Sequence, residues 1–448
     1  MPGEATAPVK NKIATDGGKL FDVKCRATFR AARLILLVHG LLGLIAAAVL
    51  TLTSVGLFHA NPLFAFCGSF VACTILLLAL VPVKPIWQSY YTTVCQERGL
   101  YEEADRLAFS GVRQVLDEIL SGRSPRDVDI DMRLQLAQVQ LIFIRKGEML
   151  KATKVAEFLS QVKDGSNDPY TDTSLASLYV EVGRYDEGFQ ILRRSLSGLD
   201  SDGRANSPAA VTTLVSLISG LVALHKVEEA QSTLGRLKTI IDGVSEDKGD
   251  LADLIIRIDA ARSDIDLAFY WYYLGRLLLV KGDSAALSTM EKARVLMQKP
   301  ENSRILTLFL PEIELAMAEG WLKSGDLSQA ASLAQSSLKL YETTTRYRGP
   351  DYHRARIVLA RAVALKGGEN NLEVMEDALR QLSSQFEPIH PVLAACLLYL
   401  AESQIKNGDY SPALANLQKS REICCRLFAE NDQMILDIDD LLAALPGS

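Results

Sequence analysis

Histidines and cysteines are the residues best suited to metal or nucleophilic chemistry in this chain of 448 residues. The five histidines are scattered, at positions 39, 59, 225, 353 and 390. The seven cysteines are odd in number and contain no Cys-x-x-Cys spacing, which does not indicate a disulfide framework or a metal site. Cys424 and Cys425 are adjacent, and because adjacent helical side chains point in different directions, we interpret them as core filling rather than as a redox pair.

Motifs that carry catalysis are absent from the sequence. It contains no phosphate loop ending in Gly-Lys-Ser/Thr, no His-Glu-x-x-His and no Gly-x-Ser-x-Gly. His225 takes the place of a turn glycine, and we expect His353 and His390, which begin or precede helices, to lie at the surface. The sequence therefore predicts a protein that is not an enzyme and has no catalytic, metal-binding or cofactor-binding residues.

Charge is distributed unevenly along the chain. The net charge is −6, yet residues 1–33 hold seven Lys and Arg against three acidic residues. A basic head on an acidic body argues against nucleic-acid binding by the body. The abundance of Leu and Ala and the low number of prolines, 15, favour helices throughout.

Two apolar segments follow the basic head. Residues 34–58 and 63–83 contain no charged residue, and each is long enough to cross a hydrocarbon core about 30 Å thick. Only residues 59–62 separate them, which predicts a transmembrane helical hairpin. Basic residues before the first segment and after the second, with none between, predict that both termini are cytoplasmic. A cleaved signal peptide is the alternative for the first segment, but a second span follows it at once.

From residue 86 onward, turns recur that each join two amphipathic helices. A glycine ends the first helix because it adopts a left-handed backbone without a Cβ penalty. A large residue follows two positions later, and Ala follows five positions after the glycine, where it lets the second helix approach the first. The eight turns lie at Gly99, Gly147, Gly183, His225, Gly282, Gly325, Gly367 and Gly408, with several steps near 42 residues.

These positions resemble the tetratricopeptide repeat (TPR) family, whose pattern combines Trp-x-x-Leu-Gly in the first helix with Gly-x-Tyr-x-x-Ala across the turn. Besides the turn glycines, the residues that carry the resemblance are Tyr101, Ala104, Tyr185, Trp271, Gly275, Ala330, Tyr410 and Ala413. Gly188 departs from the pattern, which has Ala there, so either the helices approach unusually closely or the array is locally soft.

The resemblance implies a right-handed TPR-like α-solenoid, which together with the two-helix transmembrane hairpin predicted from the apolar segments makes an all-α chain. We expect a basic cytoplasmic tail at 1–33, the hairpin at 34–83, about eight repeats at 86–430 and a capping helix with a tail at 431–448. The longest step contains residues 243–263, for which an extended second helix and an inserted loop are both open.

In the family, partner contacts come mostly from one face of the first helix of each repeat. This implies the following candidates for partner binding: Tyr272, Arg276, Glu319, Arg354, Arg361 and Glu402. Arg354 and Arg361 are seven positions apart, hence on one helical face, and their forks suit carboxylate or phosphate groups. The alternative is that these arginines pair internally with acids such as Glu319.

The sequence as a whole predicts a membrane-anchored scaffold that recruits protein partners through a TPR superhelix and needs no cofactor. The alternative is an accessory or assembly factor whose hairpin itself binds a membrane-embedded complex. The partners expected are proteins and, through two spans, the lipid bilayer, without nucleic acid. Small residues spaced by four, such as Gly43 and Ala47, favour packing inside the hairpin, with a homo-oligomer as the alternative.

Overall fold

The computed structural model describes residues 101–125, 128, 130–162, 169–246, 253–299, 309–345, 347–368 and 371–446. The predicted tail, both predicted spans and Gly99 lie outside these residues. Among the described helices, none combines the length and the apolar character that crossing a membrane requires. The described residues form helices and their connections without a strand, and the chain divides into two units, residues 1–139 and 140–448.

The described part of the first unit contains α4 (Tyr101–Phe109), α5 (Arg113–Leu120) and the beginning of α6 (Ile130–Lys146). The helix is interrupted between α4 and α5 at Gly111, whose φ of +94° is left-handed. Val112, Leu116 and Ile119 are buried and give α5 an apolar face. The second helix expected after the Gly99 turn is therefore two short helices.

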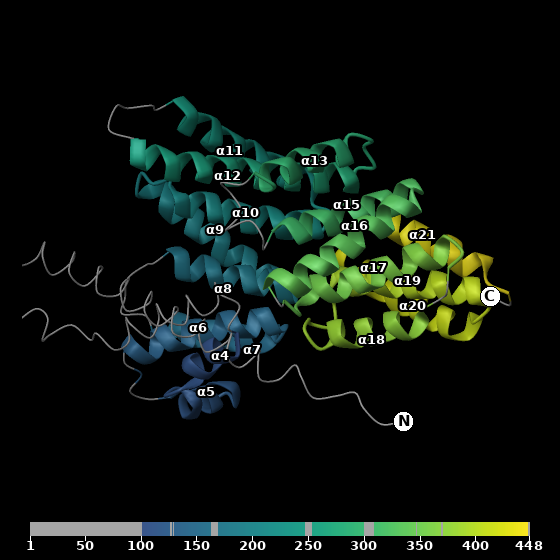
Figure 1. The fold of residues 1–448 in the computed structure, drawn as a ribbon, viewed down its shortest axis with the longest axis horizontal. Coiled ribbons are helices and arrows are strands. Elements are labelled where there is room, and N and C mark those ends of the chain that lie inside the picture. Colours follow the sequence, from purple (N-terminus) through teal and green to yellow (C-terminus); the bar gives the residue numbers. More distant parts are fainter. Residues whose placement is uncertain are drawn as a thin grey trace, which may run out of the picture. The chain divides into compact units, whose positions relative to one another are not determined.

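The second unit consists of helix pairs that follow one another along the chain (Figure 1). After α6 and α7 (Met149–Gln161), the pairs are α8 (Pro169–Val182) with α9 (Tyr185–Ser201), α10 (Pro208–Ala223) with α11 (Val227–Glu246), α12 (Asp253–Val280) with α13 (Ala286–Met297), α15 (Leu310–Ser324) with α16 (Leu327–Leu340), α17 (Pro350–Leu365) with α18 (Leu372–Ser383), and α19 (Pro391–Asn407) with α20 (Tyr410–Leu427). A π-helical segment, η2 (Tyr341–Thr345), continues α16, and α21 (Gln433–Ala444) ends the array against α20.

Each of the six pairs from α8 to α20 packs internally, and the first helices also contact one another in the order α8, α10, α12, α15, α17, α19. The core is correspondingly divided into clusters, one extending from α8 to α15, one from α15 to α17 and one from α17 to α21. This is the packing of a helical solenoid, in which one pair cannot bury its own apolar face and its neighbours complete the core.

Left-handed residues end the first helices at the positions that the sequence predicts. The φ angles are +77° at Gly147, +99° at Gly183, +53° at His225, +68° at Gly282, +87° at Gly325, +93° at Gly367 and +85° at Gly408. Among the described residues, His225 is the single residue other than glycine with a positive φ. Its prediction as a substitute for a turn glycine is confirmed.

The small residues of the repeat allow the paired helices to approach closely. Ala152, Ala230, Ala330 and Ala413 are fully buried. A Cβ at Gly275 would lie 2.4 Å from Met290 Cγ of the partner helix, in the repeat that also contains the half-buried Trp271. At the aromatic position the repeats differ, since Tyr185 is buried whereas Tyr410 is 44% exposed.

Gly188 lies where α9 meets α8. A Cβ at this position would be 2.9 Å from Val180 Cγ2 and 3.0 Å from the carbonyl oxygen of Ala176. Between the two alternatives that the sequence left open, the structure favours a close approach of the helices over a locally soft array.

Two expectations need correction. His353 and His390 are buried, not at the surface, because the first turn of α17, which contains His353, and the N-cap of α19, which is His390, pack into the second unit. Within residues 243–263, α11 runs to Glu246 and α12 begins at Asp253, so the extra residues that the structure describes lengthen both helices. Residues 247–252 lie outside the described residues, and the choice between helix and loop stays open for them.

Candidate partner groove

Arg354 on α17 and Glu319 on α15 form a two-pronged ion pair between neighbouring first helices. Arg354 Nε lies 2.6 Å from Glu319 Oε1, and Nη2 lies 2.5 Å from Oε2. The side chains are only 11% and 12% exposed. Asp351 accepts a further hydrogen bond of 3.1 Å from Arg354 Nη1. The internal pairing considered from the sequence is therefore present, and a role of Arg354 in binding a partner stays a prediction.

Arg361 lies about two turns along the same face of α17 from Arg354 and pairs with Glu402 on α19. The two side chains are 15% and 26% exposed, and the guanidinium of Arg361 lies 4.0 Å from the ring centroid of Tyr399. Four of the six candidates thus come together as two pairs that connect α15 to α17 and α17 to α19. The sequence could not show this, since the partners are 35 and 41 residues apart.

We use the name groove for the row of first helices on which the candidate residues lie. Tyr272 belongs to the core and not to the exposed surface of this groove. Its side chain is fully buried. Its hydroxyl donates a hydrogen bond of 2.8 Å to Glu312 and accepts one of 2.9 Å from Arg276 Nη1. Tyr272 therefore positions Arg276 and Glu312.

Tyr272, Arg276 and Glu312 form a polar cluster, and carboxylates from three first helices, α8, α15 and α17, lie around it. Burial raises the pKa of Glu181 on α8, and the nearby charges of Asp351 and Glu312 raise it further. Burial and Asp351 likewise raise the pKa of Glu312. Although burial would raise the pKa of Glu319, the charge of Arg354 lowers it below its ordinary value. The cluster therefore holds one strongly ionised acid beside acids that resist ionisation.

Glu181 and Asp351 are members of this cluster that the sequence analysis missed. Glu181 lies in the last turn of α8, two residues before Gly183, and Asp351 lies in the first turn of α17. A count of positions around the helix could have marked Glu181 as a candidate. It could not have shown that α8 brings Glu181 close to acids more than 130 residues away.

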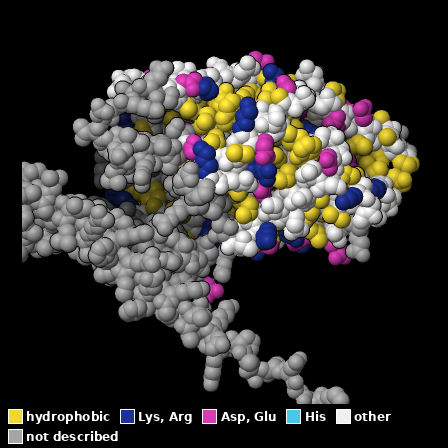
Figure 2. Space-filling view, turned by 45° about the horizontal axis from the view of Figure 1, so that its top comes forward, with side chains coloured by type: hydrophobic (Ala, Val, Ile, Leu, Met, Phe, Trp, Pro, Cys, Tyr) yellow, Lys and Arg dark blue, Asp and Glu magenta, His cyan; other side chains and the backbone are white. Residues whose placement is uncertain are grey.

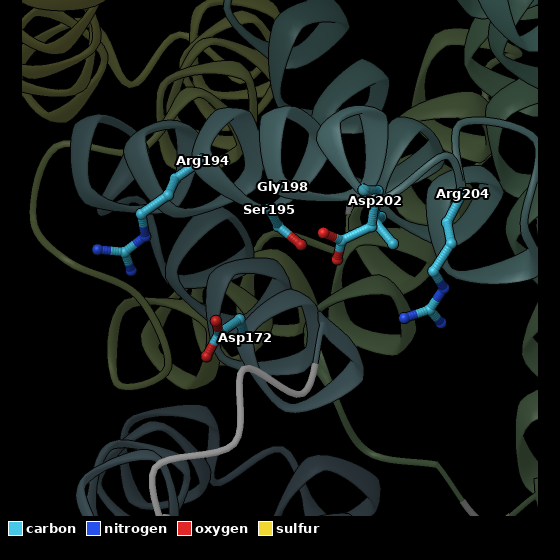
Figure 3. Close-up of a pocket in the computed structure, with 7 residues that line it drawn as sticks. Asp172, Arg194, Ser195, Gly198, Asp202 and Arg204 are labelled. Carbon is cyan, nitrogen blue, oxygen red and sulfur yellow. The ribbon is translucent and has the colours of Figure 1, made fainter.

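A shallow pocket lies elsewhere on the second unit, along α9 (Figure 3). Asp172, Ser195 and Asp202 occupy its middle, whereas Arg194 and Arg204 extend from its two ends. Acidic and basic groups balance there, so the lining favours neither an anion nor a cation. The vicinal cysteines offer no alternative site, because Cys424 is buried, which raises its pKa to about 12, while Cys425 is exposed.

Comparison with known proteins gives loose likenesses only. No protein-family model and no curated protein matches the chain. Among solved structures, the quorum sensor NprR of B. thuringiensis in its apo form is 14% identical over 79% of this chain and 92% of its own, with a TM-score of 0.40. A signal-transduction ATPase with a tetratricopeptide repeat sensor from Pyrococcus horikoshii is 13% identical over 84% of this chain and 54% of its own, with a TM-score of 0.35.

The TPR domain of P58(IPK) is 14% identical over 89% of this chain and 96% of its own, with a TM-score of 0.24. Such low values carry no argument about function. The class of protein rests instead on the packing itself. Helix pairs joined by left-handed turn residues, with first helices in a continuous row, make this an all-α repeat protein of TPR-like architecture.

Proposed function

We propose that this protein is a scaffold that recruits a protein partner through the row of first helices in its repeats. The observation that carries the proposal is the pair of ion pairs, Arg354 with Glu319 and Arg361 with Glu402, on that row. Both are largely removed from solvent, where an arginine fork discriminates strongly between partners. A carboxylate of a partner that replaced Glu319 would gain the same two-pronged geometry with Arg354.

The face of the described residues that is shown in Figure 2 favours recognition by shape and specific charges rather than by a single-sign field. On the face shown in Figure 2, Lys and Arg side chains are interspersed with Asp and Glu and with hydrophobic side chains. Such a surface does not present the basic stripe that nucleic-acid binding requires. The proposal includes no enzymatic activity, because the described groove candidates are engaged in ion pairs and in hydrogen bonds with tyrosine.

Residues 34–58 and 63–83 would tether this scaffold to a membrane, with both termini in the cytoplasm. The support is the length and apolar character of the two segments and the basic residues that flank them. Reporter fusions at residues 10, 60 and 448 of the full chain test this topology. A reporter at residue 448 that proved to lie on the opposite side from residue 10 would contradict it.

The groove itself is tested by reversing an ion pair in the full-length, detergent-solubilised chain. Arg361→Glu places two carboxylates together, whereas Arg361→Glu with Glu402→Arg restores a pair of opposite polarity. If Arg361 contacts the partner, both variants lose partner capture, although the double variant retains the wild-type melting temperature. Capture restored in the double variant would show that the pair is only structural. Capture that depends on residues 34–83 alone would instead favour an accessory of a membrane-embedded complex.

A further inference from the structure

The second unit has a first half, which contains the turns at Gly147, Gly183 and His225, and a second half, which begins with α15. These three consecutive turns are held by loops of the second half. At the Gly147 turn, the backbone N–H of Arg348 donates a hydrogen bond of 2.8 Å to the carbonyl oxygen of Arg145. At the Gly183 turn, the N–H of Glu387 donates one of 2.8 Å to the carbonyl of Val182. These bonds join segments about two hundred residues apart, which no repeat-to-repeat stacking requires.

The third contact is made by side chains at the His225 turn. His225 Nδ1 lies 2.6 Å from Asp432 Oδ2, and the imidazole stacks on Phe428 with ring centroids 4.4 Å apart. The Gly183 turn has a comparable addition, because the Tyr185 hydroxyl lies 3.4 Å from His390 Nε2. The His225 and Tyr185 contacts join residues 207 and 205 positions apart. The three contacts therefore follow one register.

The same device is absent from the other turns of the described repeats. A Cβ at Gly147 would lie 2.2 Å from the carbonyl oxygen of Arg348, and one at Gly183 would lie 3.0 Å from His390 Cδ2. At Gly282, Gly325, Gly367 and Gly408 a Cβ would meet no atom within 4 Å. The contacts thus belong to a specific closure between the two halves and not to the repeat as such.

Closure has an electrostatic cost that the contacts must overcome. It brings Glu181 of α8 towards Glu312 of α15 and Asp351 of α17, with Arg354 as the opposing charge. Tyr185, Tyr273, Tyr347 and His390 complete the titratable surroundings of Glu181. Burial and crowding of these acids, which raise the pKa of Glu181 and Glu312, disfavour the closed arrangement, while a few hydrogen bonds and one stacked pair hold it.

We propose that these three contacts form a latch, defined by the turns at Gly147, Gly183 and His225 and by residues 348, 387–390 and 428–432, which holds the partner groove closed. A partner engages the ion pairs on the first helices after the latch opens. The inference rests on the proposed function of the groove and adds its regulation, because the ion pairs that would engage a partner are largely buried in the closed array.

His225→Gly tests the latch without altering the turn, because glycine is the residue that the other described turns use at this position. Hydrogen exchange of the full-length chain reports on the Arg348 and Glu387 amides, whose bonds cross between the halves. Loss of the His225 contact should raise the population of the open arrangement by about tenfold, so exchange at both amides should accelerate by about tenfold or more. Helices α12 and α15 should stay protected. Unchanged exchange at both amides would overturn the latch.

Asp432→Asn is a second variant, which keeps an oxygen for the N–H of Met434 and weakens the contact with His225. Asp409→Ala is the matched control, since Asp409 lies at an open turn and bonds only locally to Asn407. Partner capture should rise severalfold in the two latch variants and not in the control. Faster exchange with unchanged or reduced capture would refute regulation by the latch. Failure of every chain, wild type included, to capture a partner would instead refute the proposed function.

Discussion

The turns at Gly147 and Gly183 and the turns at Gly325 and Gly408 have the same local backbone but opposite surroundings. All four residues are left-handed and end a first helix. The first two are pressed against loops of the distant half, whereas a side chain at the last two would point into open space. A repeated local motif thus fixes the turn, while its environment depends on where the turn falls in the array.

The largest expected difference between enclosed and open surroundings concerns ion pairs. Arg354→Leu leaves Glu319 uncompensated in a site that is 12% exposed, so we expect a loss of about 3–5 kcal/mol in the free energy of unfolding. Arg193→Leu removes a pair with Glu229 in which the side chains are 52% and 41% exposed, with an expected loss of about 1 kcal/mol or less. Urea titration of both variants measures this contrast, and equal losses would contradict it.

A smaller contrast is expected at the turn glycines themselves. Ala at Gly147 or at Gly325 adopts a left-handed conformation at a cost of about 1–2 kcal/mol. At Gly147 the added Cβ also meets the backbone oxygen of Arg348, so the total loss should reach about 3 kcal/mol or more. Thermal unfolding of Gly147→Ala and Gly325→Ala compares the two. If Gly325→Ala proved the more damaging, the distinction between held and open turns would be wrong.

Helix glycines provide the same comparison without a left-handed backbone. Gly235→Ala in α11 adds a Cβ where no atom lies within 4 Å, so it should stabilise the protein by up to about 1 kcal/mol. Gly188→Ala should lose about 1–2 kcal/mol, because Val180 and the Ala176 carbonyl crowd the position. The sign of the change in melting temperature distinguishes the two sites. Stabilisation by both substitutions would show that α9 and α8 separate easily.

The smallest effect expected is the pH dependence that arises from the enclosed carboxylates. Glu181 is protonated in both the folded and the unfolded chain below about pH 4.5. As pH rises, the unfolded chain releases this proton first, so stability is lost as pH rises through the raised pKa of the folded state. Between about pH 5 and pH 9, Glu181→Gln should reduce this loss by about 1 kcal/mol. Glu228→Gln, on the exposed face of α11, is the matched control and should leave the pH profile unchanged.

Local rules were enough to predict most of the architecture of the described residues. The turn positions followed from glycine and from His225, because the end of a helix is decided by the few residues around it. The buried alanines followed in the same way, from the need of paired helices to approach. The first repeat was less predictable, since Gly111 breaks its second helix within a stretch whose apolar pattern continues.

The groove was predictable as a set of positions but not as a set of interactions. Counting along the first helices selected Arg354, Glu319, Arg361 and Glu402, yet their pairing required the spacing between helices. Tyr272 was selected as a groove residue and is buried, because a position on the inner face becomes core wherever neighbouring elements cover it. His390 was expected at the surface and is buried against Phe386, with ring centroids 3.8 Å apart, for the same reason.

By itself the sequence determined the all-α class, the order of helices and the left-handed turns, since these depend on hydrophobic periodicity and on backbone sterics within a few residues. The tertiary structure alone decided that three turns are held by loops about two hundred residues away and that the charges of Glu312 and Asp351 act on Glu181. Small rotations between successive repeats accumulate along a solenoid, so contacts between its distant halves depend on the whole array and leave no local signature.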